Sequence, residues 1–436
     1  MYAKLSFRNA RRSFSDYLLY ITTLIVLSAI MMFSNLLAAA SSQNGLQASS
    51  APLIISMVAV ALLSYINGYM LRSRAKEFAT YILLGMKKNR IAAVFFGESL
   101  LLALVGLFIG LILGSLCFLS ALSFLRAWFP IAESFSAVLG IAARDSLLYF
   151  ITIQVLSLLS CLYKVKKMKI GNLMKEERKN QTLKGKPHPL FWSIFCIVCV
   201  AADLVFVSFI TGSNDILMML GTNTVIFSLI LGVWAFYKAS FHWLAWLRLN
   251  RRSELYQGSR LYLVAQMLSK IASNILLNTV LSVCLLFSVM TFSVGLIMPN
   301  IPGDLFPGET GIWMSFVQIC MSIVFIAIYF SILAVRQVIE AKENRRAFRM
   351  MAYLGKTDRQ RKSLIKQEIV LKYTLPAIMC LFILTLCAGQ INEFLNSFLS
   401  AGNLLFAAIG YFTVCLMLMY AGYSFVAYKL CVKNIL

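Results

Sequence analysis

Few residues of this chain have the types and spacing that catalysis requires. Leu354–Thr357 reads Leu-Gly-Lys-Thr and ends like a phosphate-binding P-loop, but such a loop needs a glycine five residues earlier, where the chain has Met350. Cys196 and Cys199 have CxxC spacing, yet no second pair or nearby histidine completes a metal site. No paired carboxylates and no Ser/His/Asp or Cys/His set gathers in any loop. We therefore expect a non-catalytic chain without metal or cofactor, whose energy comes from a partner chain or an ion gradient.

The composition indicates that lipid is the main solvent of this chain. Of its 436 residues, 60% are hydrophobic and 13% are charged, whereas a soluble domain is about half apolar and about a quarter charged. The net charge of +23 could indicate nucleic-acid binding, but the basic residues lie in short loops between long apolar runs, as the positive-inside rule requires. We expect an all-α polytopic membrane protein that binds the lipid bilayer and no nucleic acid.

Ten apolar runs are long enough to cross a hydrocarbon core of about 30 Å. They are residues 17–40, 52–71, 95–122, 146–163, 190–212, 217–237, 273–297, 312–335, 371–390 and 403–428. The first run is longer than the h-region of a signal peptide, so it is expected to be retained. The N-terminus, alternate connections and the tail hold 38 of the 40 lysines and arginines. This bias predicts a multi-pass cell-membrane protein with both termini in the cytoplasm.

The sequence contains an internal repeat. Phe78–Gly85 is echoed by Phe348–Gly355 at an offset of 270, with the same Phe, Leu and Gly, and a glutamate follows thirteen residues after each glycine. Tyr163–Ile170 resembles Tyr428–Ile435 at an offset of 265. Six predicted spans, an even number, separate equivalent helices, so the two copies form a parallel repeat. Chance similarity between two basic loops is the alternative, and it explains the fixed spacing less well.

Each copy contains an amphipathic helix that leaves the membrane, turns at a glycine and returns; we call these segments, residues 77–88 and 343–356, the elbows. Their apolar faces have two possible partners, the lipid headgroups or another protein. Two equivalent elbows suit a partner with two equivalent surfaces, such as an ATPase dimer. The candidate coupling residues are Glu77, Phe78, Tyr81, Leu84, Gly85, Met86, Phe348, Met351, Leu354 and Gly355.

Residues 1–16 form a second kind of amphipathic segment. Phe7 and Phe14 fall on an apolar stripe, and Arg8 and Arg11 fall on a basic one. We expect this helix to lie along the inner leaflet.

Three acidic residues lie in or near the spans. Glu98 and Glu368 follow the two elbows, and a structural ion pair with Arg90 or Lys372 is the default interpretation. Asp203 lies deeper, in the fifth predicted span, where an unpaired acid is costly. A proton or substrate role and a paired or water-lined position are equally consistent with it.

Four segments together resemble a known family: Lys4–Ser13 with Asp16–Leu18, Glu77–Lys88, Glu98–Leu101 and Lys169–Arg178. They are similar to the FtsX-like permeases, the membrane subunits of one class of ABC transporters. Within that family the chain looks most like the ten-helix permeases associated with bacitracin and antimicrobial-peptide resistance. Those permeases carry a large extracellular domain between the seventh and eighth spans, where this chain has only Met298–Gly311.

The resemblance implies two permease cores, formed by helices 2–4 and 8–10. Residues 17–180 are then the first half with its core at 52–180, residues 181–258 are two linker helices, and residues 259–436 are the second half with its core at 312–436. It also implies a separate cytoplasmic ABC ATPase that drives export, extraction or signalling, with an antimicrobial peptide or a lipid-related molecule as the target. A sensor histidine kinase or an accessory membrane subunit is a further implied partner.

Two other functions stay open. A secondary transporter would use an ion gradient through Asp203, although matched Gly/Pro breaks in the two halves are missing. A non-transporting scaffold would regulate a kinase or a cell-wall enzyme and would keep the ATPase.

Overall fold

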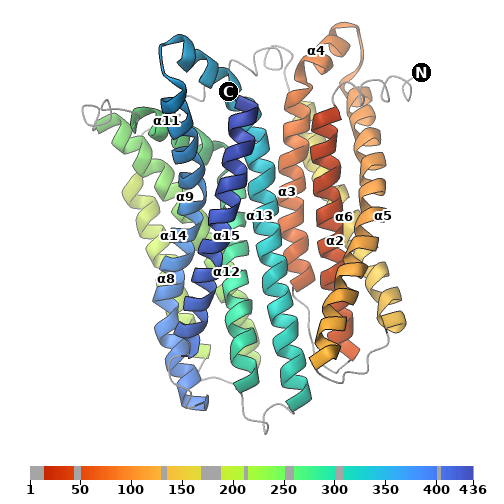
Figure 1. Ribbon diagram of the computed structural model, residues 1–436, viewed down its shortest axis with the longest axis vertical. Helices are drawn as coiled ribbons and strands as arrows, with labels where there is room; N and C mark the ends of the chain where they lie inside the picture. Colours follow the sequence, from red (N-terminus) through yellow and green to blue (C-terminus); the bar gives the residue numbers. More distant parts are fainter. Residues whose placement is uncertain are drawn as a thin grey trace. The chain divides into compact units, whose positions relative to one another are not determined.

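The computed structural model describes residues 14–43, 51–128, 135–167, 188–210, 215–250, 260–300, 308–399 and 404–435. Within these ranges the chain is almost entirely helical and contains no β-strand (Figure 1). The helices are α2 (Phe14–Gln43), α3 (Ala51–Ser73), α4 (Ala75–Leu83), α5 (Lys88–Trp128), α6 (Phe135–Lys167), α8 (Pro189–Ile210), α9 (Asp215–Asn250), α11 (Arg260–Ser273), α12 (Ile275–Ile297), α13 (Gly308–Tyr353), α14 (Asp358–Leu399) and α15 (Leu404–Ile435).

Eight helices in the described part of the chain are long and apolar enough to cross a membrane: α2, α3, α5, α6, α12, α13, α14 and α15. This confirms the prediction of a helical, multi-pass membrane protein. The fifth and sixth predicted spans coincide with α8 and α9, but parts of both fall outside the side chains that the structure describes. The count of ten spans and the cytoplasmic position of the termini therefore stay predictions.

The predicted inner-leaflet helix lies mostly outside the described residues. Phe7, Arg8 and Arg11 precede the first described residue, and Phe14 begins α2. The interpretation of this segment stays a prediction.

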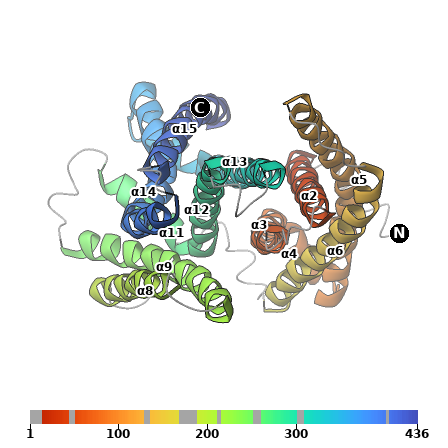
Figure 2. The same ribbon diagram turned by 90° about the horizontal axis from the view of Figure 1, so that it is seen from below.

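The chain divides into two compact units. The first comprises residues 1–180 with 330–335, and the second comprises residues 181–329 with 336–436. In the first unit, α2 packs against α5 and α6, and α3 packs against α6 (Figure 2). Buried hydrogen bonds join these helices, from Asn35 to Ser146 at 3.0 Å and from Asn67 to Ser157 at 2.7 Å. Such bonds hold helices together where lipid offers no polar alternative.

A seam of glycines lets α5 approach α2 closely. Gly106, Gly110 and Gly114 recur every fourth residue, and the backbone oxygen of Gly106 accepts a 2.9 Å hydrogen bond from Ser28 Oγ. A Cβ atom at Gly106 would lie 2.7 Å from Leu24 Cβ, and one at Gly110 would overlap Ser28 Oγ. Small residues at this spacing are the usual device by which membrane helices pack without a hydrophobic driving force.

The second unit is organised around α12, which packs against α9, α14 and α15. Hydroxyl pairs join its helices in the interior: Tyr237 with Ser282 at 2.6 Å and Ser288 with Ser322 at 3.1 Å. Helices α8 and α9 form a hairpin that lies beside this bundle (Figure 2).

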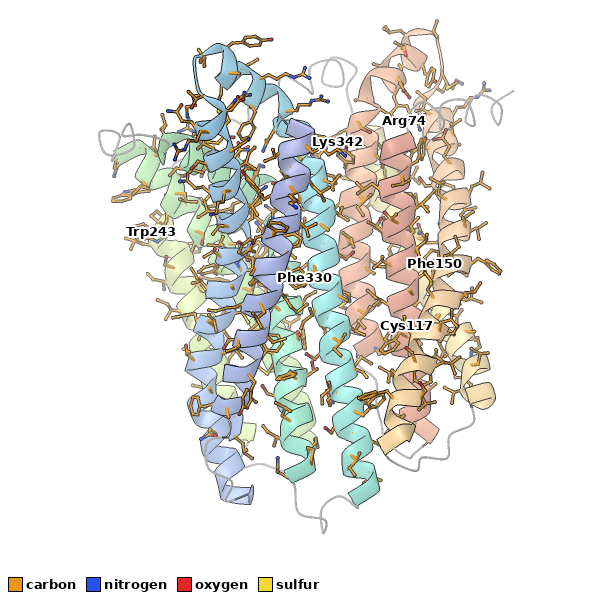
Figure 3. All side chains as sticks on the ribbon, viewed as in Figure 1. Arg74, Cys117, Phe150, Trp243, Phe330 and Lys342 are labelled. Atoms are coloured by element: carbon orange, nitrogen blue, oxygen red, sulfur yellow. The ribbon has the colours of Figure 1, made fainter. Side chains whose placement is uncertain are left out.

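The outward faces of several helices are covered with apolar side chains (Figure 3). Leu104 and Phe108 on α5, and Met417 and Leu418 on α15, are each more than half exposed. Such faces would be unfavourable in water, and they fit contact with lipid acyl chains.

Candidate functional site

The first elbow is a short helix closed by a glycine turn. Helix α4 ends at Leu83, and Gly85 adopts a φ of +89°, which a side-chain-bearing residue rarely tolerates. The amide of Gly85 donates to the carbonyl of Ile82, and the amide of Met86 donates to that of Tyr81, both at 3.0 Å. This pair of bonds defines a Schellman motif, which satisfies the last carbonyls of a helix.

The second elbow has the same turn. Gly355 has a φ of +88° and donates to the carbonyl of Ala352, and Lys356 donates to that of Met351, again at 3.0 Å. Every one of these positions lies 270 residues after its counterpart in the first elbow. The two segments therefore share a backbone conformation as well as a sequence pattern.

The Gly-Lys-Thr sequence of the second elbow has a structural explanation. Gly355 closes α13, and Thr357 then precedes α14, which begins at Asp358. Thr357 Oγ1 accepts a hydrogen bond from the amide of Gln360, and Gln360 Oε1 accepts one from the amide of Thr357. This reciprocal pair is a capping box. The resemblance to a P-loop thus arises from a helix end followed directly by a helix start.

The predicted elbow residues separate into buried and exposed groups. Leu84 and Leu354 are 83% and 84% exposed, whereas Phe78 and Phe348 are buried. Glu77, Tyr81, Met86 and Met351 are half-buried. Two exposed residues were missed by the sequence pattern: Leu83 and Tyr353, at 66% and 89% exposure. They directly precede Leu84 and Leu354, so the end of each helix carries two adjacent exposed apolar side chains, which we call the elbow tips.

The buried phenylalanines fix each elbow to its own bundle. The Phe78 ring packs edge-to-face on Phe95 of α5, with ring centroids 6.3 Å apart. The Phe348 ring packs in the same manner on Tyr262 of α11, at 6.2 Å. A force applied at a tip is therefore passed directly to a membrane helix.

A buried ion pair lies at the base of the first elbow. The Arg74 guanidinium, between α3 and α4, donates to the Glu98 carboxylate and to the Tyr17 hydroxyl, the latter at 2.6 Å. Tyr17 in turn donates to Glu98 at 2.7 Å. Burial alone lowers the pKa of a guanidinium, but the negative charge of Glu98 outweighs it, so the pKa of Arg74 is raised above its ordinary value.

The sequence spacing points to Arg90 as the partner of Glu98, and it does not single out Arg74. Arg90 lies on an exposed part of α5, whereas the Arg74 side chain is 4% exposed. The chain break between α3 and α4 turns the Arg74 side chain inward, and this break could not be read from the apolar pattern.

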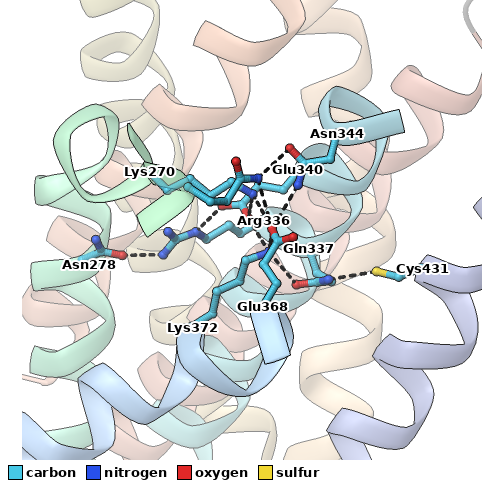
Figure 4. Close-up of polar contacts among 10 residues, drawn as sticks. Lys270, Asn278, Arg336, Gln337, Glu340, Asn344, Glu368, Lys372 and Cys431 are labelled. Atoms are coloured by element: carbon cyan, nitrogen blue, oxygen red, sulfur yellow. Dashed lines mark hydrogen bonds and ion pairs between the residues drawn. The ribbon is translucent and has the colours of Figure 1, made fainter. Parts of the chain in front are cut away.

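A larger charged cluster lies at the base of the second elbow (Figure 4). Glu368 accepts from Lys270 at 2.7 Å, from Lys372 at 3.1 Å and from Asn344 at 3.0 Å. The contact with Lys372 is the one that the sequence spacing suggests. Asn344 lies 270 residues after Arg74, so equivalent positions contact the equivalent glutamate in both elbows.

The cluster extends to a second glutamate on α13. Glu340 binds Lys270 at 2.7 Å, Arg336 at 2.7 Å and Lys372 at 2.5 Å. Arg336 also donates to Asn278 of α12. These five charged residues join α11, α13 and α14, and three of them, Lys270, Arg336 and Glu340, were not singled out by the sequence pattern.

Asp203 lies on α8 and is buried, at 6% exposure. Its Oδ1 atom has no hydrogen-bond partner among the described residues. In the same part of the chain, no group of three His, Cys, Asp or Glu side chains could hold a metal ion.

The comparisons with known proteins agree with the elbow geometry over part of the chain. Residues 49–173 match a family model described as FtsX-like permease C-terminal. No curated protein matches the sequence. The matched segment is less than a third of the chain and comprises α3, α4, α5 and most of α6, so it contains the first elbow and the Arg74–Glu98 pair. The match supports a membrane subunit of the FtsX-like ABC permease family, which is generally non-catalytic and generally pairs with an ABC ATPase.

Proposed function

We propose that this chain is the permease subunit of an ABC transporter, and that a separate cytoplasmic ATPase engages its two elbow tips. The proposal rests on one observation above all: the tips have the same backbone turn and the same exposure at positions 270 residues apart. Leu83 and Leu84 form the first tip, and Tyr353 and Leu354 form the second.

The geometry of the tips favours a protein partner over lipid headgroups. An interfacial helix lies in the membrane plane with a whole apolar face open to lipid. In α4 that face is already used, because Ala75, Phe78 and Ala79 are buried within the first unit. What stays exposed is a compact pair of apolar side chains at a helix end, a shape that fits a pocket on a partner surface.

The finer parts of the proposal extend the sequence resemblance. We propose ten spans, cytoplasmic termini, and two parallel repeat cores at 52–180 and 312–436, by analogy with the bacitracin-type permeases. Export, extraction or signalling that involves an antimicrobial peptide or a lipid-related target fits this analogy. A sensor histidine kinase or an accessory membrane subunit fits it as a further partner.

The test is co-purification of the full chain from its native host, followed by identification of the partner by mass spectrometry and an ATPase assay in nanodiscs. We expect an ABC ATPase whose activity is altered by the permease. Leu84→Glu and Leu354→Glu should each weaken the association about tenfold or more, because each removes one buried apolar anchor and inserts a charge. The double variant should abolish it.

Gln367→Glu is the matched control, since it adds the same charge at an exposed position of α14. It should leave the association unchanged. An ATPase that remains bound and regulated in the double tip variant would disprove the proposal, and so would the absence of any ABC ATPase.

Asp203 supports a second candidate, a secondary transporter. A buried carboxylate oxygen without a hydrogen-bond partner among the described residues is costly, and such acids mark proton or ion paths in membrane proteins. This candidate predicts uptake into proteoliposomes without ATP, which Asp203→Asn abolishes. If transport requires ATP and survives Asp203→Asn, this candidate is excluded.

A further inference from the structure

The second unit contains a pocket that no part of the proposed function uses. It opens between α9, α11, α12, α13 and α14, and it has a volume of about 450 Å³ with its open mouth included. Its polar wall is formed by charged members of the cluster at the base of the second elbow: Lys270, Arg336, Glu368 and Lys372. The pocket is therefore a place where a ligand from outside the chain can reach this cluster.

The cluster has an excess of positive charge. Three cations, Lys270, Arg336 and Lys372, share two carboxylates, those of Glu340 and Glu368. An uncompensated charge in a buried position is expensive. One monovalent anion in the pocket would balance the cluster.

The positive charge is also the accessible part of the cluster. The side chains of Glu340 and Glu368 are 3% and 9% exposed, while those of Lys270 and Lys372 are 14% and 11% exposed. Both lysines line the pocket, and Glu340 does not. The wall that a ligand meets is therefore cationic, with the amide of Gln266 as an additional hydrogen-bonding group.

The remaining walls are apolar and follow the direction of the membrane helices. On α11, Leu263, Met267 and Ile271 recur every fourth residue and line the pocket. On α14, Leu375 and Pro376 lie one turn beyond Lys372, further into the membrane-spanning helix. A ligand that fits both walls has an anionic head and an apolar tail.

We propose that this pocket binds one anionic phospholipid of the surrounding membrane. The phosphate diester of the lipid accepts hydrogen bonds from Lys270 and Lys372, and its acyl chains lie against Leu263, Met267 and Leu375. Basic pockets between membrane helices recognise anionic headgroups in this manner. The proposal does not depend on the ATPase, so it stands or falls separately from the proposed function.

The experiment measures lipid binding to the delipidated full chain in a neutral detergent by native mass spectrometry. Phosphatidylglycerol and phosphatidylcholine are titrated in parallel. We expect phosphatidylglycerol to bind at least tenfold more tightly. Lys270→Gln and Lys372→Gln should each weaken its binding about tenfold, because each removes a charge-assisted hydrogen bond to the phosphate.

Two variants separate the site from general effects. Lys366→Gln removes an exposed charge from the same helix, and it should leave binding unchanged. Leu375→Trp fills the apolar part of the pocket without altering any charge, and it should abolish the preference for phosphatidylglycerol while circular dichroism shows an intact fold.

Three results would overturn the proposal. The first is equal binding of the two lipids, and the second is an unchanged preference in Leu375→Trp. The third is displacement of phosphatidylglycerol by millimolar inorganic phosphate, which would assign the pocket to a free anion.

Discussion

Replacing Arg74 tests whether the first elbow is held to its bundle by the buried ion pair. Arg74→Met keeps most of the side-chain volume and removes the charge. The Arg74 and Glu98 side chains are 4% and 6% exposed, so the variant leaves a carboxylate in an environment that water cannot easily enter. Tyr17 still donates one hydrogen bond to it, which is too little to replace a cation.

The expected loss is about 3–5 kcal/mol of unfolding free energy, the range measured when one partner of a buried ion pair is removed. Adding Glu98→Gln should recover about 2 kcal/mol, because the second substitution removes the uncompensated charge. The raised pKa of Arg74 means that its stabilisation is lost only as pH rises past that folded-state pKa. In ordinary alkaline buffers the loss in Arg74→Met should therefore be constant.

Unfolding free energies can be measured in mixed micelles, by titration with a denaturing detergent and circular dichroism. Arg90→Met is the matched control, because Arg90 is exposed on α5 and is the partner that sequence spacing favours. Its effect should lie within about 0.5 kcal/mol. The reasoning fails if Arg90→Met destabilises more than Arg74→Met, or if the effects of Arg74→Met and Glu98→Gln simply add.

Three further predictions concern the packing, the second cluster and the turns. Gly110→Ala should cost about 1–3 kcal/mol by forcing α2 and α5 apart, whereas Gly140→Ala, whose Cβ would meet no atom within 4 Å, should be neutral or stabilising in the same titration. Glu340→Gln should cost about 3–5 kcal/mol, because Glu340 contacts all three cations of the cluster; a loss below about 1 kcal/mol would show that those cations are solvated. Gly85→Ala and Gly355→Ala should each cost about 1 kcal/mol through the positive φ alone, since nothing lies within 4 Å of either position; a marked difference between the two would contradict the equivalence of the turns.

The sequence was sufficient for the features that depend on local chemistry. Long apolar runs predict membrane helices because lipid satisfies no backbone polar group. The glycines at 85 and 355 predict the ends of the elbow helices, since a left-handed residue is needed there. The pairing of Glu368 with Lys372 follows from their i,i+4 spacing on one helix.

The sequence was not sufficient for contacts between distant helices. Arg74 and Glu98 are 24 residues apart, and Lys270 is 98 residues from Glu368. Their encounters depend on how the helices cross, and an apolar stripe does not encode that crossing. The glycine seam of α5 carried a visible signal, a small residue at every fourth position, which predicts close helix packing without naming the partner helix.

The two elbows share a turn but differ in how they are joined to the membrane helices. The second is the end of α13, one continuous helix of 46 residues, whereas the first is a separate helix of nine residues after the break at Arg74. A push on the second tip is carried along an unbroken hydrogen-bonded rod. A push on the first tip must pass through the packing of Phe78 and through the pair that Arg74 forms with Glu98 of α5. Because a break in a helix can bend at small energetic cost, the ion pair at that break decides whether the first elbow moves with its bundle or independently of it.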